Sequence, residues 1–160
     1  MRIVIAADHA GYHLKELIKR ELGKRGHEIE DMGTHSSQSV DYPDFAQKAA
    51  EAVASGGYAR GIVICGTGIG VSITANKVPG IRAALCNELY SAQLSREHNN
   101  ANILAMGSRI VGPGLAFRIV ETFISAGYSG GRHAARVEKM RRLEGAYTGK
   151  QDPEGPDSNC

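Results

Sequence analysis

Apolar and polar residues follow two different periods along this chain. Short apolar runs, the first at Ile3–Ala6, are typical of strands buried on both faces of a sheet. Between these runs lie longer stretches in which apolar residues recur every three or four positions, as on one side of an amphipathic helix. In the first such stretch, Gly11–Lys24, the pattern places the apolar residues on an inner face and assigns three basic residues to the polar face: Lys15, Lys19 and Arg20.

The alternation predicts five strands and six helices. The strands are Ile3–Ala6, His27–Asp31, Gly61–Cys65, Ile81–Cys86 and Ile103–Met106. The helices are Gly11–Lys24, Tyr42–Ala54, a helix from about Val71, Leu89–His98, Gly114–Ser125 and Arg132–Leu143. Strands that alternate with helices form right-handed crossovers and a parallel sheet with helices on both faces. We therefore expect an α/β fold, a three-layer, doubly wound, Rossmann-like sheet with the common strand order 2-1-3-4-5.

The 160 residues suit a single domain with its own core. From Gly145 to Cys160 the chain carries Gly, Pro, Asp, Ser and Asn and almost nothing apolar. Such a composition does not bury enough surface to fold. The expected organisation is one domain over residues 1–144 and a flexible tail over residues 145–160.

Basic and acidic residues nearly balance, with a formal net charge of +2. A chain without an excess of either sign lacks the general field that attracts nucleic acid or an anionic membrane surface. No segment approaches the ~20 apolar residues that span a bilayer, and Met1–Ala7 is too short for the apolar part of a signal peptide. We expect a cytoplasmic protein with neither nucleic acid nor membrane as a partner.

The cysteines favour neither a disulfide framework nor a thiolate metal site. There are three of them, Cys65, Cys86 and Cys160, and none shows C-x-x-C spacing. His9 and His13 have the i, i+4 spacing of a zinc-binding helix, but Ala10 stands where that motif carries glutamate. The sequence thus predicts no metal site.

The segment Gly61–Ser72 carries the strongest chemical signal, because a buried strand runs there into a glycine-rich turn with Cys65 at the junction. The backbone amides of such a turn form a positive cradle for an oxyanion or phosphate. A thiol in the same field is favoured as the thiolate, so Cys65 is a candidate base or nucleophile. The alternative is that Cys65 only ends a buried strand, as free cysteines often do.

The expected topology brings this turn next to Asp8 and His9. Ligands of doubly wound folds bind at the carboxyl ends of the strands where the order reverses, here the first and third strands. Asp8 and His9 follow the first strand, and Cys65–Gly70 follow the third. Asp8 is also open to a plainer reading, as a helix N-cap.

Further polar residues are open to two readings. His98 and Asn99 close a helix, where histidine either shuttles protons or merely complements the helix dipole. Arg132 and Arg136 share one face of a helix start, which suggests either a bound anion or a solvated face paired with residues such as Glu138. Arg109 is ambiguous in the same way.

The glycine turn fits neither of two common phosphate motifs. It lacks the Lys-Ser/Thr pair of a Walker A loop, and Val71 replaces the arginine of a cysteine phosphatase loop. Its spacing is G-x-G-x-G, whereas a dinucleotide fold requires G-x-G-x-x-G. A non-catalytic nucleotide-binding module that uses Gly66–Gly70 and Glu88 as the ribose-binding acid remains an alternative.

Several motifs in order resemble the B-type ribose-5-phosphate isomerases over about residues 1–143. These motifs are Ala7–Gly11, Asp41–Pro43, Cys65–Gly70 with Ala75–Lys77, Tyr90–Asn99 and Gly130–His133. The same family includes galactose-6-phosphate and allose-6-phosphate isomerases. The resemblance implies an aldose-ketose isomerase that forms an enediolate, with no metal or organic cofactor, acting on ribose 5-phosphate or on a hexose 6-phosphate.

The resemblance also implies roles for individual residues. Cys65 is the carbon base, since the loop Ile69–Val71 lacks the glutamate that other members use. His98 assists ring opening with Asp8 nearby, and Thr67 moves a hydroxyl proton. Binding residues are Tyr42, Ile69, the amides of Gly66, Gly68 and Gly70, Asn99 as a sugar contact, and the phosphate ligands His9, Arg109, Arg132 and Arg136. The family forms homodimers, in some cases tetramers, with an active site shared between subunits; which of His98, Arg109, Arg132 and Arg136 crosses over stays open.

Overall fold

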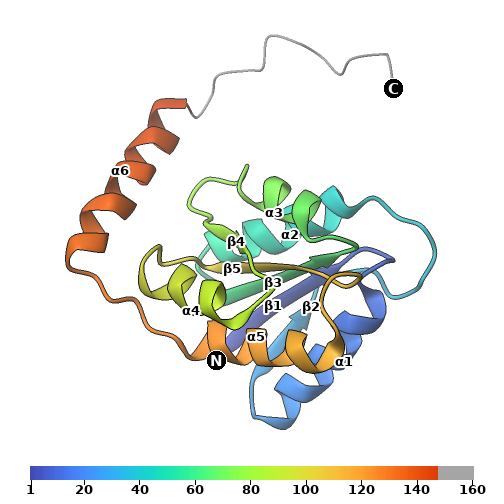
Figure 1. Ribbon diagram of the computed structural model, residues 1–160. Coiled ribbons are helices and arrows are strands. Elements are labelled where there is room, and N and C mark those ends of the chain that lie inside the picture. The colour runs from blue at the N-terminus through green and yellow to red at the C-terminus, as the bar shows by residue number, and fades with distance from the viewer. Residues whose placement is uncertain (148–160) are drawn as a thin grey trace.

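Five parallel strands form the centre of the computed structural model, which describes residues 1–147 (Figure 1). The strands are β1 (Arg2–Ala7), β2 (Glu28–Asp31), β3 (Arg60–Cys65), β4 (Ala83–Leu85) and β5 (Ile103–Gly107). The helices are α1 (Tyr12–Lys24), α2 (Tyr42–Ala54), α3 (Ile69–Ala75), α4 (Leu89–Glu97), α5 (Pro113–Ser125) and α6 (Arg132–Tyr147). Every predicted strand and helix is present, which confirms the predicted α/β fold class.

The sheet is buried on both faces because its strands are apolar throughout. In β1, Ile3, Ile5 and Ala7 point to the face covered by α1 and α5. Val4 and Ala6 point to the other face, which α2 and α3 cover. This alternation produces two separate apolar cores, one on each side of the sheet.

The predicted strand order is wrong at its last two positions. The observed order is β2-β1-β3-β5-β4, so β5 lies beside β3 and β4 is the edge strand. All residues of β5 are buried, whereas the short β4 is partly exposed. An interior position requires apolar side chains on both faces, which favours β5 there. The Asn76 side chain pairs with both backbone groups of Ala83, at 2.8 and 2.9 Å, and so protects the exposed edge of β4.

The interpretation of Lys15 as a residue of the polar face is also wrong. Lys15 is fully buried, and its ammonium lies 2.5 Å from a carboxylate oxygen of Asp31 at the end of β2. It precedes Ile18 by three positions and Leu22 by seven, so it lies on the same inner stripe of α1 as those core residues. Burial of the charge is possible because Asp31 provides a partner.

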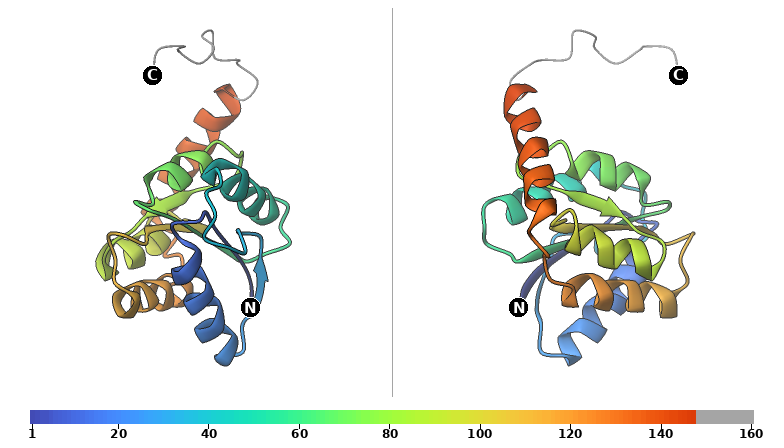
Figure 2. Two further views of the ribbon diagram at one scale, coloured as in Figure 1. Left: turned by 90° about the vertical axis from the view of Figure 1, so that its right-hand side faces the viewer. Right: turned by 60° about the vertical axis from the view of Figure 1, so that its left-hand side comes forward.

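Helix α6 stands away from the sheet, as Figures 1 and 2 show. It has one buried residue, His133. A carboxylate oxygen of Glu144 accepts the backbone N–H of Gly80 at 2.9 Å. The helix runs past its predicted end at Leu143 to Tyr147, so the predicted tail begins as helix. The rest of that tail, residues 148–160, lies outside the described residues. Within residues 1–147, no helix combines the length and apolar character that crossing a bilayer requires.

Candidate functional site

The carboxyl ends of β1 and β3 lie side by side, as predicted. Ala7 pairs with Ile64, and the N–H of Asp8 donates to the carbonyl of Ile64 at 3.3 Å. Close approach depends on Gly11, because a Cβ there would lie 2.8 Å from Ile64. The next residues along the two strands are Asp8 and Cys65, so the two loops with the most chemistry meet at one edge of the sheet.

The turn after β3 is shaped around the sulfur of Cys65. The side chain is 5% exposed, and the N–H of Gly68 donates to Sγ at 3.1 Å. Gly68 has φ +79°, and a Cβ there would lie 2.5 Å from Leu85 and 2.6 Å from the backbone of Met106. Only glycine fits this position. An amide that donates to the sulfur stabilises negative charge on it, as a base or nucleophile requires.

The turn after β5 packs directly on this loop. Ser108 donates its backbone N–H to the carbonyl of Cys65 at 2.9 Å, and its hydroxyl to the carbonyl of Ala10 at 2.8 Å. Arg109 donates its N–H to the carbonyl of Gly66 at 3.0 Å. Its guanidinium lies 3.4 Å from where a Cβ of Gly66 would be. Ser108 thus connects three loops, a role that the sequence analysis missed because a lone serine has no distinguishing pattern.

Asp8 and His9 are held by different parts of the chain. Asp8 is buried, and one of its carboxylate oxygens accepts the N–H of Gly11 at 3.0 Å. It therefore stabilises the turn before α1, although the N-cap of that helix is Gly11 itself. Nδ1 of His9 lies 3.2 Å from both the N–H and the carbonyl of Val40, in the loop before α2.

Tyr42 and Thr67 border the same edge. A Cβ on Gly70 would lie 2.5 Å from the Tyr42 ring, so the ring rests on the first turn of α3. The Thr67 hydroxyl accepts the N–H of Ile69 at 3.3 Å, and both residues are exposed. The structure therefore gathers one group of predicted site residues at the carboxyl edge: Asp8, His9, Tyr42, Cys65, Gly66, Thr67, Gly68, Ile69, Gly70 and Arg109.

His98 and Asn99 lie at the opposite edge of the sheet. They follow α4, which returns from the carboxyl end of β4 to the amino end of β5. Arg82, just before β4, donates from Nε to the carbonyl of Asn99 at 3.1 Å. At about 3.3 Å per residue, a five-residue strand separates this edge from Cys65 by about 17 Å.

Helix α6 adds two arginines and a histidine near His98. The rings of His98 and His133 stack with centroids 4.1 Å apart and an interplanar angle of 5°. Desolvation, His98 and the guanidinium groups of Arg132 and Arg136 lower the pKa of His133. The sequence analysis gave His133 no role; its place beside Arg132 was the available signal.

Two alternatives from the sequence lose support in this geometry. Glu138 contacts Arg141 and Arg142, at 3.9 and 3.3 Å, and was the suggested partner for the preceding arginines of α6. Both oxygens of Glu88 accept backbone N–H groups of α4, each at 2.6 Å, so this carboxylate caps the helix.

In residues 1–147, no three histidine, cysteine or carboxylate side chains are grouped to hold a metal ion.

Comparison with known proteins identifies the family of the chain. Residues 3–140 match the family model described as Ribose/Galactose Isomerase. The chain belongs to this family. This membership confirms the resemblance found in the sequence.

Members of the ribose/galactose isomerase family are similar to the chain over nearly their whole length. Ribose-5-phosphate isomerase B of Escherichia coli (strain K12) is 52% identical over 143 residues, which are 89% of this chain and 96% of that protein. The structure of Clostridium thermocellum ribose-5-phosphate isomerase B matches with a TM-score of 0.91 and 59% identity, covering 92% and 100% of the two chains. Ribose-5-phosphate isomerase B from Mycoplasma genitalium, with bound ribulose-5-phosphate, matches with a TM-score of 0.87 and 41% identity, covering 90% and 96%.

Proposed function

We propose that this protein is an aldose-ketose isomerase that interconverts ribose 5-phosphate and ribulose 5-phosphate. The observation that carries the proposal is the Gly68 N–H directed at Sγ of Cys65, in a glycine turn beside Asp8. Membership of the ribose/galactose isomerase family and high identity to ribose-5-phosphate isomerase B proteins support the same activity.

In the proposed mechanism, Cys65 as thiolate removes the proton from C2 of the open aldose and later returns it to C1. The intermediate enediolate carries negative charge on oxygen, which the amides of the Gly66–Gly70 turn stabilise. Loss of one such donor typically raises the activation barrier by about 3 kcal/mol. Thr67 transfers the hydroxyl proton between the two oxygens. These groups supply a base and an oxyanion site, so we propose that the reaction requires no metal or organic cofactor.

We infer that the working form is a homodimer in which the partner completes each site. The length of a five-residue strand, about 17 Å, separates Cys65 from the end of the sheet where His98 and Asn99 lie, and this is farther than one pentose phosphate reaches. Arg132 and Arg136 belong to the start of α6, where His133 stacks on His98. His98 of the partner subunit would open the sugar ring. Arg132 and Arg136 of the partner subunit would bind the phosphate together with His9 and Arg109. Exposed apolar side chains on α3 and at the start of α4 support this contact: Ile69, Ile73 and Tyr90 are 53%, 57% and 69% exposed. We also propose a cytoplasmic location, where a free thiol such as that of Cys65 is kept reduced.

The nearest alternative is an isomerase of allose or galactose 6-phosphate, because the family description names galactose as well as ribose. An assay of ribose 5-phosphate, allose 6-phosphate and galactose 6-phosphate decides between them. We expect the highest kcat/KM for ribose 5-phosphate. A higher value for a hexose phosphate would overturn the substrate, and nucleotide binding by calorimetry without any isomerisation would overturn the enzyme class.

A further inference from the structure

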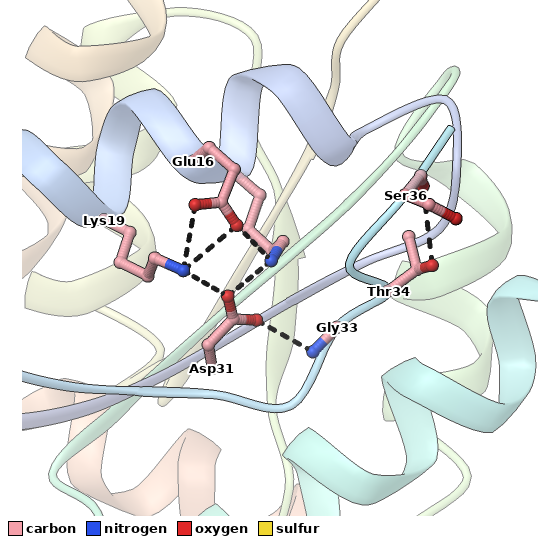
Figure 3. Close-up of polar contacts among 7 residues, drawn as sticks. Glu16, Lys19, Asp31, Gly33, Thr34 and Ser36 are labelled. Atoms are coloured by element: carbon pink, nitrogen blue, oxygen red, sulfur yellow. Dashed lines mark hydrogen bonds and ion pairs between the residues drawn. The ribbon is translucent and has the colours of Figure 1, made fainter. Parts of the chain in front are cut away.

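A fully buried lysine lies beneath the candidate site. The Lys15 ammonium contacts the Asp31 carboxylate at 2.5 Å and Glu16 at 2.7 Å. Figure 3 shows the Asp31 carboxylate between the Lys19 ammonium, at 2.6 Å, and the backbone N–H of Gly33. Burial of a charge is costly, and a protein in which apolar residues of similar volume replace a buried ion pair is often at least as stable. Stability alone therefore does not explain the ion pair between Lys15 and Asp31.

The pair fixes the chain as it leaves β2. The second oxygen of Asp31 accepts the N–H of Gly33 at 3.0 Å, and Thr34 donates its N–H to the carbonyl of Ala7 at 2.9 Å. A Cβ on Gly33 would lie 2.5 Å from the nitrogen of Ala7 and 2.9 Å from the stem of Lys15. The loop is thus pressed between Lys15 and the last residue of β1, which immediately precedes Asp8 and His9.

The same loop, residues 32–41, ends at the His9 ring. The N–H and the carbonyl of Val40 both lie 3.2 Å from Nδ1 of His9. When the N–H donates to Nδ1, the ring proton resides on Nε2, and Nε2–H is then the group available to an anion. The position of Val40 therefore sets the orientation of a proposed phosphate ligand, and the choice between its N–H and its carbonyl sets the tautomer.

We propose that Lys15 and Asp31 are positioning residues for substrate phosphate, which anchor loop 32–41 so that Val40 holds His9 as the Nε2–H tautomer. The inference rests on the proposed function, in which His9 binds phosphate. Hydrogen bonds from Lys15 and Lys19 outweigh desolvation and lower the pKa of Asp31, consistent with an ionised partner. The ion pair touches neither Cys65 nor the glycine turn, so it acts on binding and not on proton transfer.

The test replaces Lys15 with methionine, which keeps the volume and removes the charge. We expect Lys15→Met to raise KM for ribose 5-phosphate about tenfold, as loss of a supporting contact typically does, with kcat nearly unchanged. The inhibition constant of inorganic phosphate should rise by a similar factor. Lys24→Met is the matched control, because Lys24 lies on the same helix and pairs with Glu21 at the surface, at 2.8 Å.

The ¹⁵N NMR signals of the His9 ring separate positioning from simple stabilisation. In the folded variant we expect them to move from the Nε2–H tautomer toward a mixture. A lower melting temperature with unchanged KM, phosphate inhibition and His9 signals would overturn the proposal, as would a fall in kcat alone. If Lys15→Met does not fold, Asp31→Asn keeps an acceptor for Gly33 and should give the same changes at smaller size. Failure of the wild type to isomerise any sugar phosphate would refute the proposed function, while phosphate binding and the His9 signals still test the positioning role.

Discussion

The sulfur of Cys65 lies where the sheet ends and the backbone turns away from it. The main-chain amide of Gly68 donates to this sulfur, and a main-chain donor costs no side-chain entropy to hold in place. That donor is correctly aimed because Gly68 has a left-handed backbone that also leaves room for Leu85. At the scale of single residues, the proposed chemistry therefore depends on one thiol and one glycine.

Cys65→Ala should fold normally and lose nearly all isomerase turnover, because no other base contacts the turn in the proposed mechanism. Exchange of the C2 hydrogen with solvent, followed by NMR of the substrate, should disappear with turnover. Cys86→Ala is the matched control, since Cys86 is equally buried but belongs to the other core. Exchange at the wild-type rate in Cys65→Ala would remove Cys65 from the role of base.

Gly68→Ala should reduce both stability and turnover. A positive φ costs a residue with a Cβ about 1–2 kcal/mol, and the contacts with Leu85 and Met106 add to this. Gly80→Ala is the control that carries only the cost of the positive φ, because Gly80 has a similar φ of +82° with open space around it. Urea unfolding and kcat of the two variants measure the difference. Equal stability and equal turnover would show that the tight packing at Gly68 is unimportant.

Helix α1 and strand β2 are joined by the buried ion pair of Lys15 and Asp31. Lys19 of the same helix is a second ion-pair partner of Asp31, at 2.6 Å, and the Lys15–Asp31 pair lies directly under the loop that reaches His9. Removal of one partner of a buried ion pair typically costs about 3–5 kcal/mol. At the scale of elements, the same contact thus contributes to both stability and geometry.

The pH dependence of stability should report this contact. Hydrogen bonds from two lysines outweigh desolvation and hold the pKa of Asp31 below its usual value of 3.8. The stabilisation is therefore complete above pH 3.8 and is lost as the pH falls through the lower folded-state pKa. Urea unfolding between pH 2 and pH 7 should show a smaller loss in acid for Asp31→Asn than for the wild type. Glu28→Gln, which affects only a surface pair with Arg2, should keep the wild-type dependence.

The whole molecule presents two groups of candidate residues at opposite edges of one sheet. Cys65, Asp8 and Arg109 lie at the carboxyl edge, while His98 and His133 lie at the amino edge and on α6. In the proposed two-fold dimer, the carboxyl edge of one copy would meet the amino edge of the other, which would build two equivalent sites. Such an arrangement would give each of the two edges a function.

Mixed dimers test the shared site. Cys65→Ala and His98→Asn proteins, each inactive, are mixed, dissociated and allowed to reassociate at random. Half the dimers are hybrids with one intact site of two, so about a quarter of wild-type activity should return. Cys65→Ala mixed with Arg109→Ala should recover nothing, because both residues lie at the same edge of one chain. No recovery with His98→Asn, despite subunit exchange confirmed by mass spectrometry, would refute the shared site.

The sequence by itself determined the elements and the loops with chemistry. Apolar runs such as Ile3–Ala6 and helical periodicity over Gly11–Lys24 are local signals, so they locate strands and helices without knowledge of their neighbours. The expected and the observed strand orders both reverse between the first and third strands, so the prediction that Asp8 and Cys65 lie together did not depend on the order of the last two strands. The motifs that resemble the family indicated the isomerase chemistry.

Only the tertiary structure decided which elements become neighbours. Strand β5 occupies the interior position, where its apolar residues are buried on both faces. The order of the strands along the chain does not encode this choice between β4 and β5. Lys15 is a core residue because Asp31, on a different element, provides a partner for its charge. His98 lies far from Cys65 because α4, which it follows, runs back to the amino ends of the strands. Each outcome depends on contacts between residues distant in sequence, and such contacts form only when the layers of the fold assemble.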